Sequence, residues 1–124
     1  MTHAPGFLKL VDDAKSRIKQ IDIEVYKKMV AAQEPHVLVD TREDREWSDG
    51  HVAGAVHLSK GIIERDIEAT YPDKATGLVL YCGGGFRSAM ACDAAQKMGY
   101  KKVHSLIGGY KGMVAAGWPM KSEG

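Results

Sequence analysis

The chain has 124 residues, which fits one domain able to bury a core without disulfides. Its 17 basic and 16 acidic side chains give a formal net charge of +1 and are spread along the chain, so neither nucleic acid nor a membrane surface is an expected partner. Residues 1–20 lack the apolar core of a signal peptide, and no apolar run is long enough to span a bilayer. With two cysteines, we expect a cytoplasmic protein whose thiols are reactive or buried rather than disulfide-bonded.

The N-terminal segment has the pattern of an amphipathic helix. Apolar side chains recur at helical spacing, with charged residues on the other side; the apolar positions are Phe7, Leu8, Val11, Ala14 and Ile18. A lone helix of this length is marginal in water, so its apolar stripe must be buried. We expect residues 1–18 to be an extension that packs on the main domain, residues 19–124, in a monomer or weak homodimer.

Short apolar runs alternate with helical patterns along the rest of the chain. Strands are expected at 19–21, 36–40, 55–58, 78–81 and 102–106. Helices are expected after Asp22, within 41–50, over 61–69, over 89–98 and after Gly109. This alternation predicts an α/β protein with a mostly parallel sheet covered on both faces. Ligands of such sheets bind outside the carboxyl ends of the strands, where Asp40 and Cys82 both fall.

The most informative stretch follows the apolar run 78–81 and reads Cys-Gly-Gly-Gly-Phe-Arg-Ser. Three consecutive glycines permit positive φ angles and leave no side chain between the backbone amides and a ligand. Such amides, together with the N-terminus of the following helix, stabilise an anion or a thiolate at Cys82. Arg87 either pairs with an oxyanion or braces the loop from outside, and both interpretations stay open here.

Four motifs, in a fixed order, resemble those of the single-domain rhodaneses, which are sulfurtransferases of the thiosulfate sulfurtransferase kind. They lie at residues 39–43, 46–55, 81–88 and 108–110 together with 117–119. The resemblance implies a rhodanese-like α/β fold, with a five-stranded, mainly parallel sheet flanked by helices on both faces. It also implies a catalytic cysteine, Cys82, that carries a persulfide on a six-residue loop, with no cofactor.

The resemblance further implies transfer of a sulfane sulfur from a donor, such as thiosulfate or a persulfide, to a thiophilic acceptor. The expected donor is a small anion, the expected acceptor is a thiol or cyanide, and a sulfur-relay protein is a further implied partner. The residues expected to contact the substrate are Gly83, Gly84, Gly85, Phe86, Arg87 and Ser88.

Several other polar residues are expected to support the site rather than to react. An ion pair of Asp40 with Arg42 or Arg45 would hold a strand end beside the loop, and His51 would brace its own turn by hydrogen bonds. The five histidines have no metal-ligand spacing with either cysteine, so we expect no metal. Cys92 lies among alanines of the helix after the loop and is interpreted as a packing residue.

Two other functions share parts of this pattern. A cysteine phosphatase or arsenate reductase of related fold has five residues between its cysteine and arginine, whereas four intervene here and Ser88 occupies the arginine position. A non-catalytic rhodanese-like module, which carries sulfur passively or binds a partner, usually lacks the cysteine that is present here. Both comparisons favour the sulfurtransferase.

Overall fold

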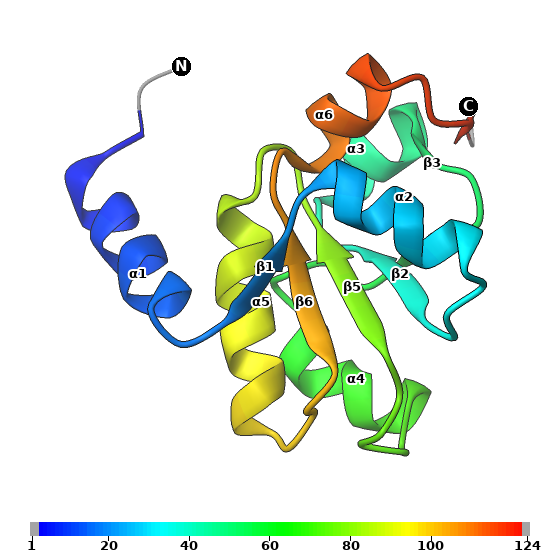
Figure 1. Ribbon diagram of the computed structural model, residues 1–124. Coiled ribbons are helices and arrows are strands. Elements are labelled where there is room, and N and C mark those ends of the chain that lie inside the picture. Colours follow the sequence, from blue (N-terminus) through cyan, green and yellow to red (C-terminus); the bar gives the residue numbers. More distant parts are fainter. Residues whose placement is uncertain (1–2, 123–124) are drawn as a thin grey trace.

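The computed structural model describes residues 3–122 and contains a five-stranded parallel sheet between layers of helices (Figure 1). In spatial order the strands are β1 (Lys19–Ile21), β6 (Val103–Leu106), β5 (Leu78–Tyr81), β2 (Val37–Asp40) and β4 (Val56–His57). Every neighbouring pair is parallel. The α/β architecture predicted from the sequence is therefore confirmed.

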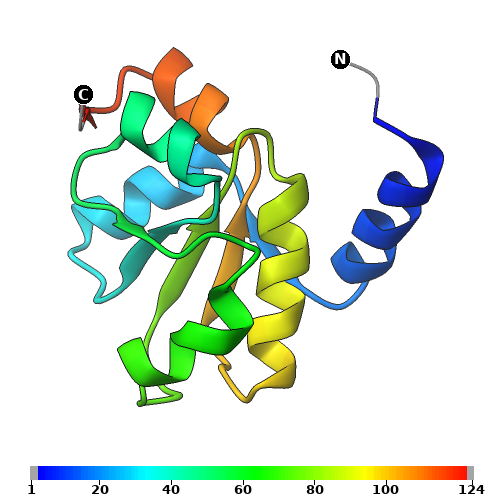
Figure 2. The same cartoon turned by 180° about the vertical axis from the view of Figure 1, so that it is seen from behind.

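Six helices flank or extend this sheet within the described residues. They are α1 (Pro5–Lys15), α2 (Ile23–Ala31), α3 (Asp44–Asp49), α4 (Ile63–Thr70), α5 (Phe86–Lys97) and α6 (Gly109–Ala115). Helix α2 lies in front of the sheet in Figure 1, and α4 and α5 lie in front of it in Figure 2. None of the helices in residues 3–122 has the length and apolarity needed to cross a bilayer.

A small second sheet is a feature that the sequence analysis did not predict. It pairs β3 (His51–Val52) with β7 (Met120–Lys121) in antiparallel register. Each strand has only two residues, too few for an alternating pattern to be recognised. The pairing ties the C-terminal part of the chain to the segment after α3.

Strand β5 forms the centre of the core because successive side chains point to opposite faces. Leu78 and Leu80 belong to the cluster that includes residues of α4 and α5, whereas Val79 and Tyr81 belong to the cluster that includes residues of α2 and α6. All four side chains are buried. This double burial fixes the carboxyl end of β5, after which Cys82 follows at once.

Helix α1 packs alongside α5, at the edge of the helical layer (Figures 1 and 2). Val11 and Ala14 are buried, as the amphipathic pattern predicted. At the end of the helix, Arg17 donates from Nε and Nη2 to the two carboxylate oxygens of Asp93 on α5, at 3.0 and 2.8 Å. The extension therefore packs on the rest of the same chain.

The contact between α1 and α5 can be measured by truncating one buried side chain. Val11 is 0% exposed, whereas its neighbour Leu10 is 63% exposed. Val11→Ala should lower the free energy of unfolding by about 2 kcal/mol, because two buried carbons are lost and a small void remains. Leu10→Ala is the matched control and should change it by less than about 0.5 kcal/mol. Urea denaturation of both variants is the measurement, and equal effects would contradict the packing described here.

Candidate active site

A pocket of about 410 Å³ opens at the carboxyl end of β5 and contains Cys82. Its wall comes from five parts of the chain: the loop after β5, the start of α5, α3, the start of α6 and the segment before and within α1. The position agrees with the rule that ligands of open parallel sheets bind outside the carboxyl ends of the strands.

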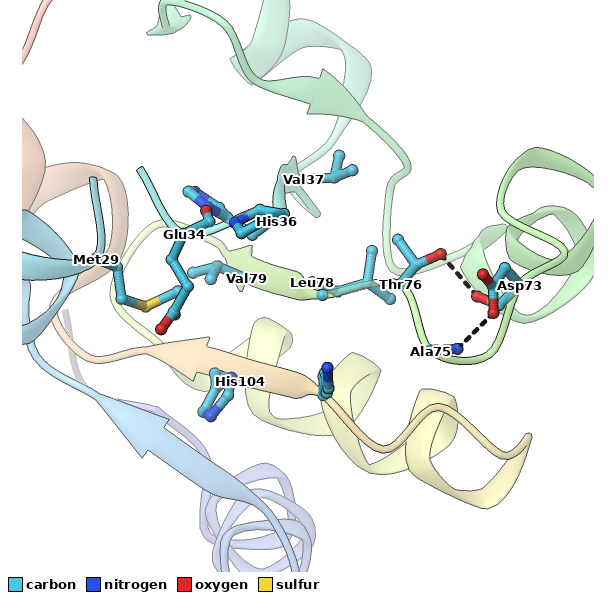
Figure 3. Close-up of a pocket in the computed structure, with 13 residues that line it drawn as sticks. Met29, Glu34, His36, Val37, Asp73, Ala75, Thr76, Leu78, Val79 and His104 are labelled. Carbon is cyan, nitrogen blue, oxygen red and sulfur yellow. Dashed lines mark hydrogen bonds between the residues drawn. The ribbon is translucent and has the colours of Figure 1, made fainter. Parts of the chain in front are cut away.

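A larger cavity, of about 560 Å³, lies at the opposite end of the sheet (Figure 3). Val37 and Leu78, which begin β2 and β5, contribute to its lining. Near its rim the carboxylate of Asp73 accepts from the Ala75 N–H at 2.9 Å, and the Asp73 carbonyl accepts from the Thr76 hydroxyl at 2.7 Å. No cysteine lines this cavity, so the pocket around Cys82 is the candidate active site.

The Cys82 sulfur lies inside the turn made by the glycine loop. Its side chain is buried, and the backbone N–H of Gly85 donates to Sγ at 3.1 Å. Gly85 has a φ of +102°, a left-handed conformation that glycine adopts without strain, and α5 begins at the next residue, Phe86. The sulfur is therefore in contact with a backbone amide and lies close to the N-terminus of α5.

The start of α6 holds the first two peptide groups of the loop. The N–H of Tyr110 donates to the carbonyl of Cys82 at 2.7 Å, and the N–H of Lys111 donates to the carbonyl of Gly83 at 3.2 Å. Because the C=O and N–H of a trans peptide point in opposite directions, the N–H groups of Gly83 and Gly84 point away from α6. Both glycines line the pocket, so these amides are available to an anion.

This close contact requires a glycine at position 109. Gly109 has a φ of +53°, and a Cβ atom placed there would overlap the carbonyl oxygen of Cys82. Gly109 therefore serves the cysteine loop as well as its own turn.

Arg87 braces the loop against α3. Its Nη1 and Nη2 donate to the two carboxylate oxygens of Glu46, at 2.6 and 3.1 Å. Glu46 also accepts the backbone N–H of Glu43 at 3.0 Å, which caps the helix. The hydrogen bonds from Arg87 are the main reason that the pKa of Glu46 falls from 4.5 to about 2. The positive charge of Arg87 is therefore balanced by the carboxylate of Glu46, and both residues line the pocket.

A second ion pair lies buried behind the loop. Arg42 donates from Nε and Nη2 to the carboxylate of Asp40, and its Nη2 also donates to the carbonyl of Gly50. The guanidinium lies 3.9 Å from the ring centroid of Tyr110, whose N–H holds the carbonyl of Cys82. Of the two arginines weighed as partners of Asp40, Arg42 makes the pair, whereas Arg45 is exposed on α3.

The remaining residues singled out from the sequence lie around the pocket or behind it. His51 is buried, with Nδ1 3.0 Å from the carbonyl of Trp47 and its ring stacked on the indole at 3.4 Å. Ser88 is buried with its hydroxyl 2.8 Å from that of Ser105, so its side chain is turned away from the pocket. Cys92 belongs to the core, and burial raises its pKa to about 12.

Residues 3–122 contain no group of three or more His, Cys, Asp or Glu side chains that could hold a metal ion.

Sequence reasoning missed four pocket residues: Glu46 as the partner of Arg87, Lys111, His3 and Phe7. Glu46 carried one usable signal, since Glu43 and Glu46 have the spacing of a capping box that marks the start of α3. The other three come from segments distant from the loop, and no spacing links them to Cys82. His57 was also passed over; its Nε2 is 2.7 Å from the carbonyl of Arg42.

The fold and the site define an α/β protein with a buried cysteine in a glycine-rich loop that follows its central strand. A family model described as a rhodanese-like domain matches residues 22–116, and the chain belongs to this family.

The relatives point to sulfur chemistry. The "Putative sulfur carrier protein YrkF" of Bacillus subtilis is 31% identical over 108 residues, which is 87% of this chain and 55% of that protein. The chain thus spans about half the length of that relative. A "Sulfurtransferase" of Allochromatium vinosum is 31% identical over 103 residues, 83% of this chain and 94% of that protein. The family supports a sulfurtransferase or sulfur-carrier class.

A similar solved structure is that of RPA3614 from Rhodopseudomonas palustris, described as a protein of unknown function and "Possible Tyrosine Phosphatase". It has a TM-score of 0.83 and 29% identity, and the match covers 98% of each chain. The match therefore includes the N-terminal helix, which the family model does not reach.

The pair of Glu46 and Arg87 predicts an acid-dependent part of the stability. Because the pKa of Glu46 is lower in the folded protein, the unfolded state binds more protons between about pH 4.5 and 2. The contribution of the pair is therefore complete above about pH 4.5 and is lost as the pH falls towards 2. Urea denaturation should give a difference in unfolding free energy between wild type and Glu46→Gln that is constant near neutral pH and shrinks below pH 4.5. A difference that persists at low pH would contradict this assignment.

The contact between Gly109 and the loop can be separated from the cost of its backbone conformation. Gly117 also has a positive φ, +79°, but a Cβ atom there would meet nothing within 4 Å. Gly117→Ala should therefore lower the free energy of unfolding by only the left-handed penalty, about 1–2 kcal/mol. Gly109→Ala should lower it further, because the new methyl group displaces the backbone of Cys82. Urea denaturation compares the two variants, and equal losses would be evidence against the close contact.

Proposed function

We propose that the protein transfers a sulfane sulfur through a persulfide on Cys82. The observation that carries this proposal is the placement of the thiol in a pocket, with the N–H of Gly85 3.1 Å from Sγ and with Gly83 and Gly84 lining the same space. Such a site stabilises both a thiolate and the anionic persulfide that replaces it. Membership of the rhodanese-like family supports the same chemistry.

The reaction proceeds in two half-reactions. The Cys82 thiolate attacks the terminal sulfur of a donor such as thiosulfate, so an S–S bond to Cys82 forms while the donor S–S bond breaks. The electron pair of the broken bond leaves with sulfite, and no external oxidant or reductant is needed. A thiol or cyanide then attacks the outer sulfur, and Cys82 leaves as the thiolate. The thiol acceptor is either a small molecule or a cysteine of a sulfur-relay protein.

The pocket offers backbone amides and one lysine for an incoming anion. Gly83 and Gly84 contribute their amides, and Lys111, at the start of α6, lines the same space. Arg87 also lines the pocket, but its charge is already matched by Glu46. We therefore assign the long-range attraction of the donor to Lys111 and the closer contacts to the loop amides. Ser88 does not line the pocket, and its hydroxyl is paired with that of Ser105.

Phosphoryl transfer is the competing activity, and one feature argues against it. The reaction needs donors around three equatorial oxygens together with a cation that faces the phosphoryl group. Arg87 follows Cys82 by five positions. Both of its terminal nitrogens donate hydrogen bonds to the carboxylate of Glu46. This geometry favours a soft terminal sulfur over a phosphate as the group attacked.

The proposal predicts opposite roles for the two cysteines. Wild-type protein incubated with thiosulfate should gain the mass of one sulfur atom, and cyanide should remove it as thiocyanate. Cys82→Ser should gain no sulfur, whereas the matched control Cys92→Ala should gain it, because Cys92 is buried in the core. Intact mass spectrometry and thiocyanate release are the measurements. Sulfur uptake by Cys82→Ser would overturn the assignment, as would aryl phosphatase turnover by the wild type that Cys82→Ser abolishes.

A further inference from the structure

Three aromatic rings form one side of the Cys82 pocket, and two of them belong to the N-terminal segment. The ring centroids of His3 and Phe86 are 4.5 Å apart, and Phe7 lies 5.4 Å from His3 and 6.2 Å from Phe86. All three residues line the pocket. We call His3, Phe7 and Phe86 the aromatic wall. Only Phe86 is part of the cysteine loop.

The aromatic wall is held in place by the packing of α1 on α5. Val11 and Ala14 are buried, and Arg17 is paired with Asp93. The Gln96 amide also donates to the carbonyl of Arg17 at 2.8 Å. These contacts hold the middle and the end of α1 on α5, which places Phe7 beside Phe86, and His3 packs on both rings. A preformed wall contributes to binding because little entropy is lost when a ligand arrives.

The two sides of the pocket differ in chemistry. The loop side presents amides and the sulfur of Cys82, which suit a charged sulfane group, whereas the wall side presents ring surface. The ammonium group of Lys15 lies 5.0 Å from the centroid of Phe86, which adds a cation beside the wall. Thiosulfate is small and fully polar, so it cannot use the ring surface. A larger donor with an apolar body can use both sides at once.

We infer that His3 and Phe7 are specificity-determining residues, and that they favour donors whose sulfane sulfur is carried on an apolar, aromatic body with a nearby negative charge. This inference rests on the proposed sulfur transfer. Both residues precede residue 22, where the family match begins, so this preference is a property of the N-terminal extension.

The reaction with such a donor balances in the same way as with thiosulfate. For an arenethiosulfonate, the Cys82 thiolate attacks the terminal sulfur and forms the persulfide. The bond between that sulfur and the sulfonyl sulfur breaks, and its electron pair leaves with the arenesulfinate. The aryl group then lies against the aromatic wall while the sulfur reaches the loop amides.

The experiment compares benzenethiosulfonate with thiosulfate in single-turnover persulfide formation, followed by intact mass at short times. For each variant, the second-order rate constant with benzenethiosulfonate is divided by that with thiosulfate. This ratio is then compared with the same ratio in the wild type. Phe7→Ala should lower this ratio about 2- to 12-fold, the range expected for one aromatic contact. Leu10→Ala, on the exposed side of the same helix, is the matched control and should leave it unchanged.

Two further variants keep the test decisive if Phe7→Ala loosens α1 and lowers the melting temperature. Phe7→Leu keeps an apolar side chain but removes the ring, and His3→Ala removes the other ring; each should also lower the ratio. Equal losses for both donors, or an unchanged ratio, would overturn the inference, as would an effect confined to discharge of the persulfide to cyanide. If the wild type forms no persulfide with either donor, the proposed function itself fails.

Discussion

The hydrogen bonds from the start of α6 to the carbonyls of Cys82 and Gly83 are the constraint on which the site depends. A loop with three consecutive glycines has many accessible conformations, and these two bonds orient its first peptide groups. They are possible because Gly109 lets the two backbones approach more closely than any side chain would allow. The N–H groups of Gly83 and Gly84 consequently point away from α6, and the N–H of Gly85 donates to the sulfur of Cys82.

The two arginines around this loop are neutralised by carboxylates, so the loop's own polar groups are its backbone amides. Arg42 and Arg87 are both close to the cysteine loop, yet each is paired with a carboxylate, Asp40 or Glu46. Arg42 lies against the ring of Tyr110, and Arg87 joins α5 to α3. Fixed amide dipoles suit sulfur transfer, because the thiolate, the persulfide and the leaving group are all anions. The site therefore stabilises a negative charge at every stage of the reaction.

Helix α1 connects stability with recognition. Its apolar stripe is buried on α5, and the same attachment places aromatic side chains at the mouth of the pocket. An element outside the parallel sheet can change without disturbing the core, so it is a suitable place for a preference between donors to arise. Under the proposed function, the loop would supply the chemistry and the N-terminal extension would select the donor.

The sequence by itself determined the elements whose signals are local. The buried run of β5, the glycine loop after it and the amphipathic stripe of α1 each depend on neighbours within one window of the chain, so periodicity reveals them. Tertiary structure alone decided the pairings between distant segments. Arg87 and Glu46 are 41 positions apart, and Phe7 and Phe86 are farther apart still. Such contacts arise only when packing of the helices on the sheet brings the segments together, and no residue pattern along the chain records that closeness.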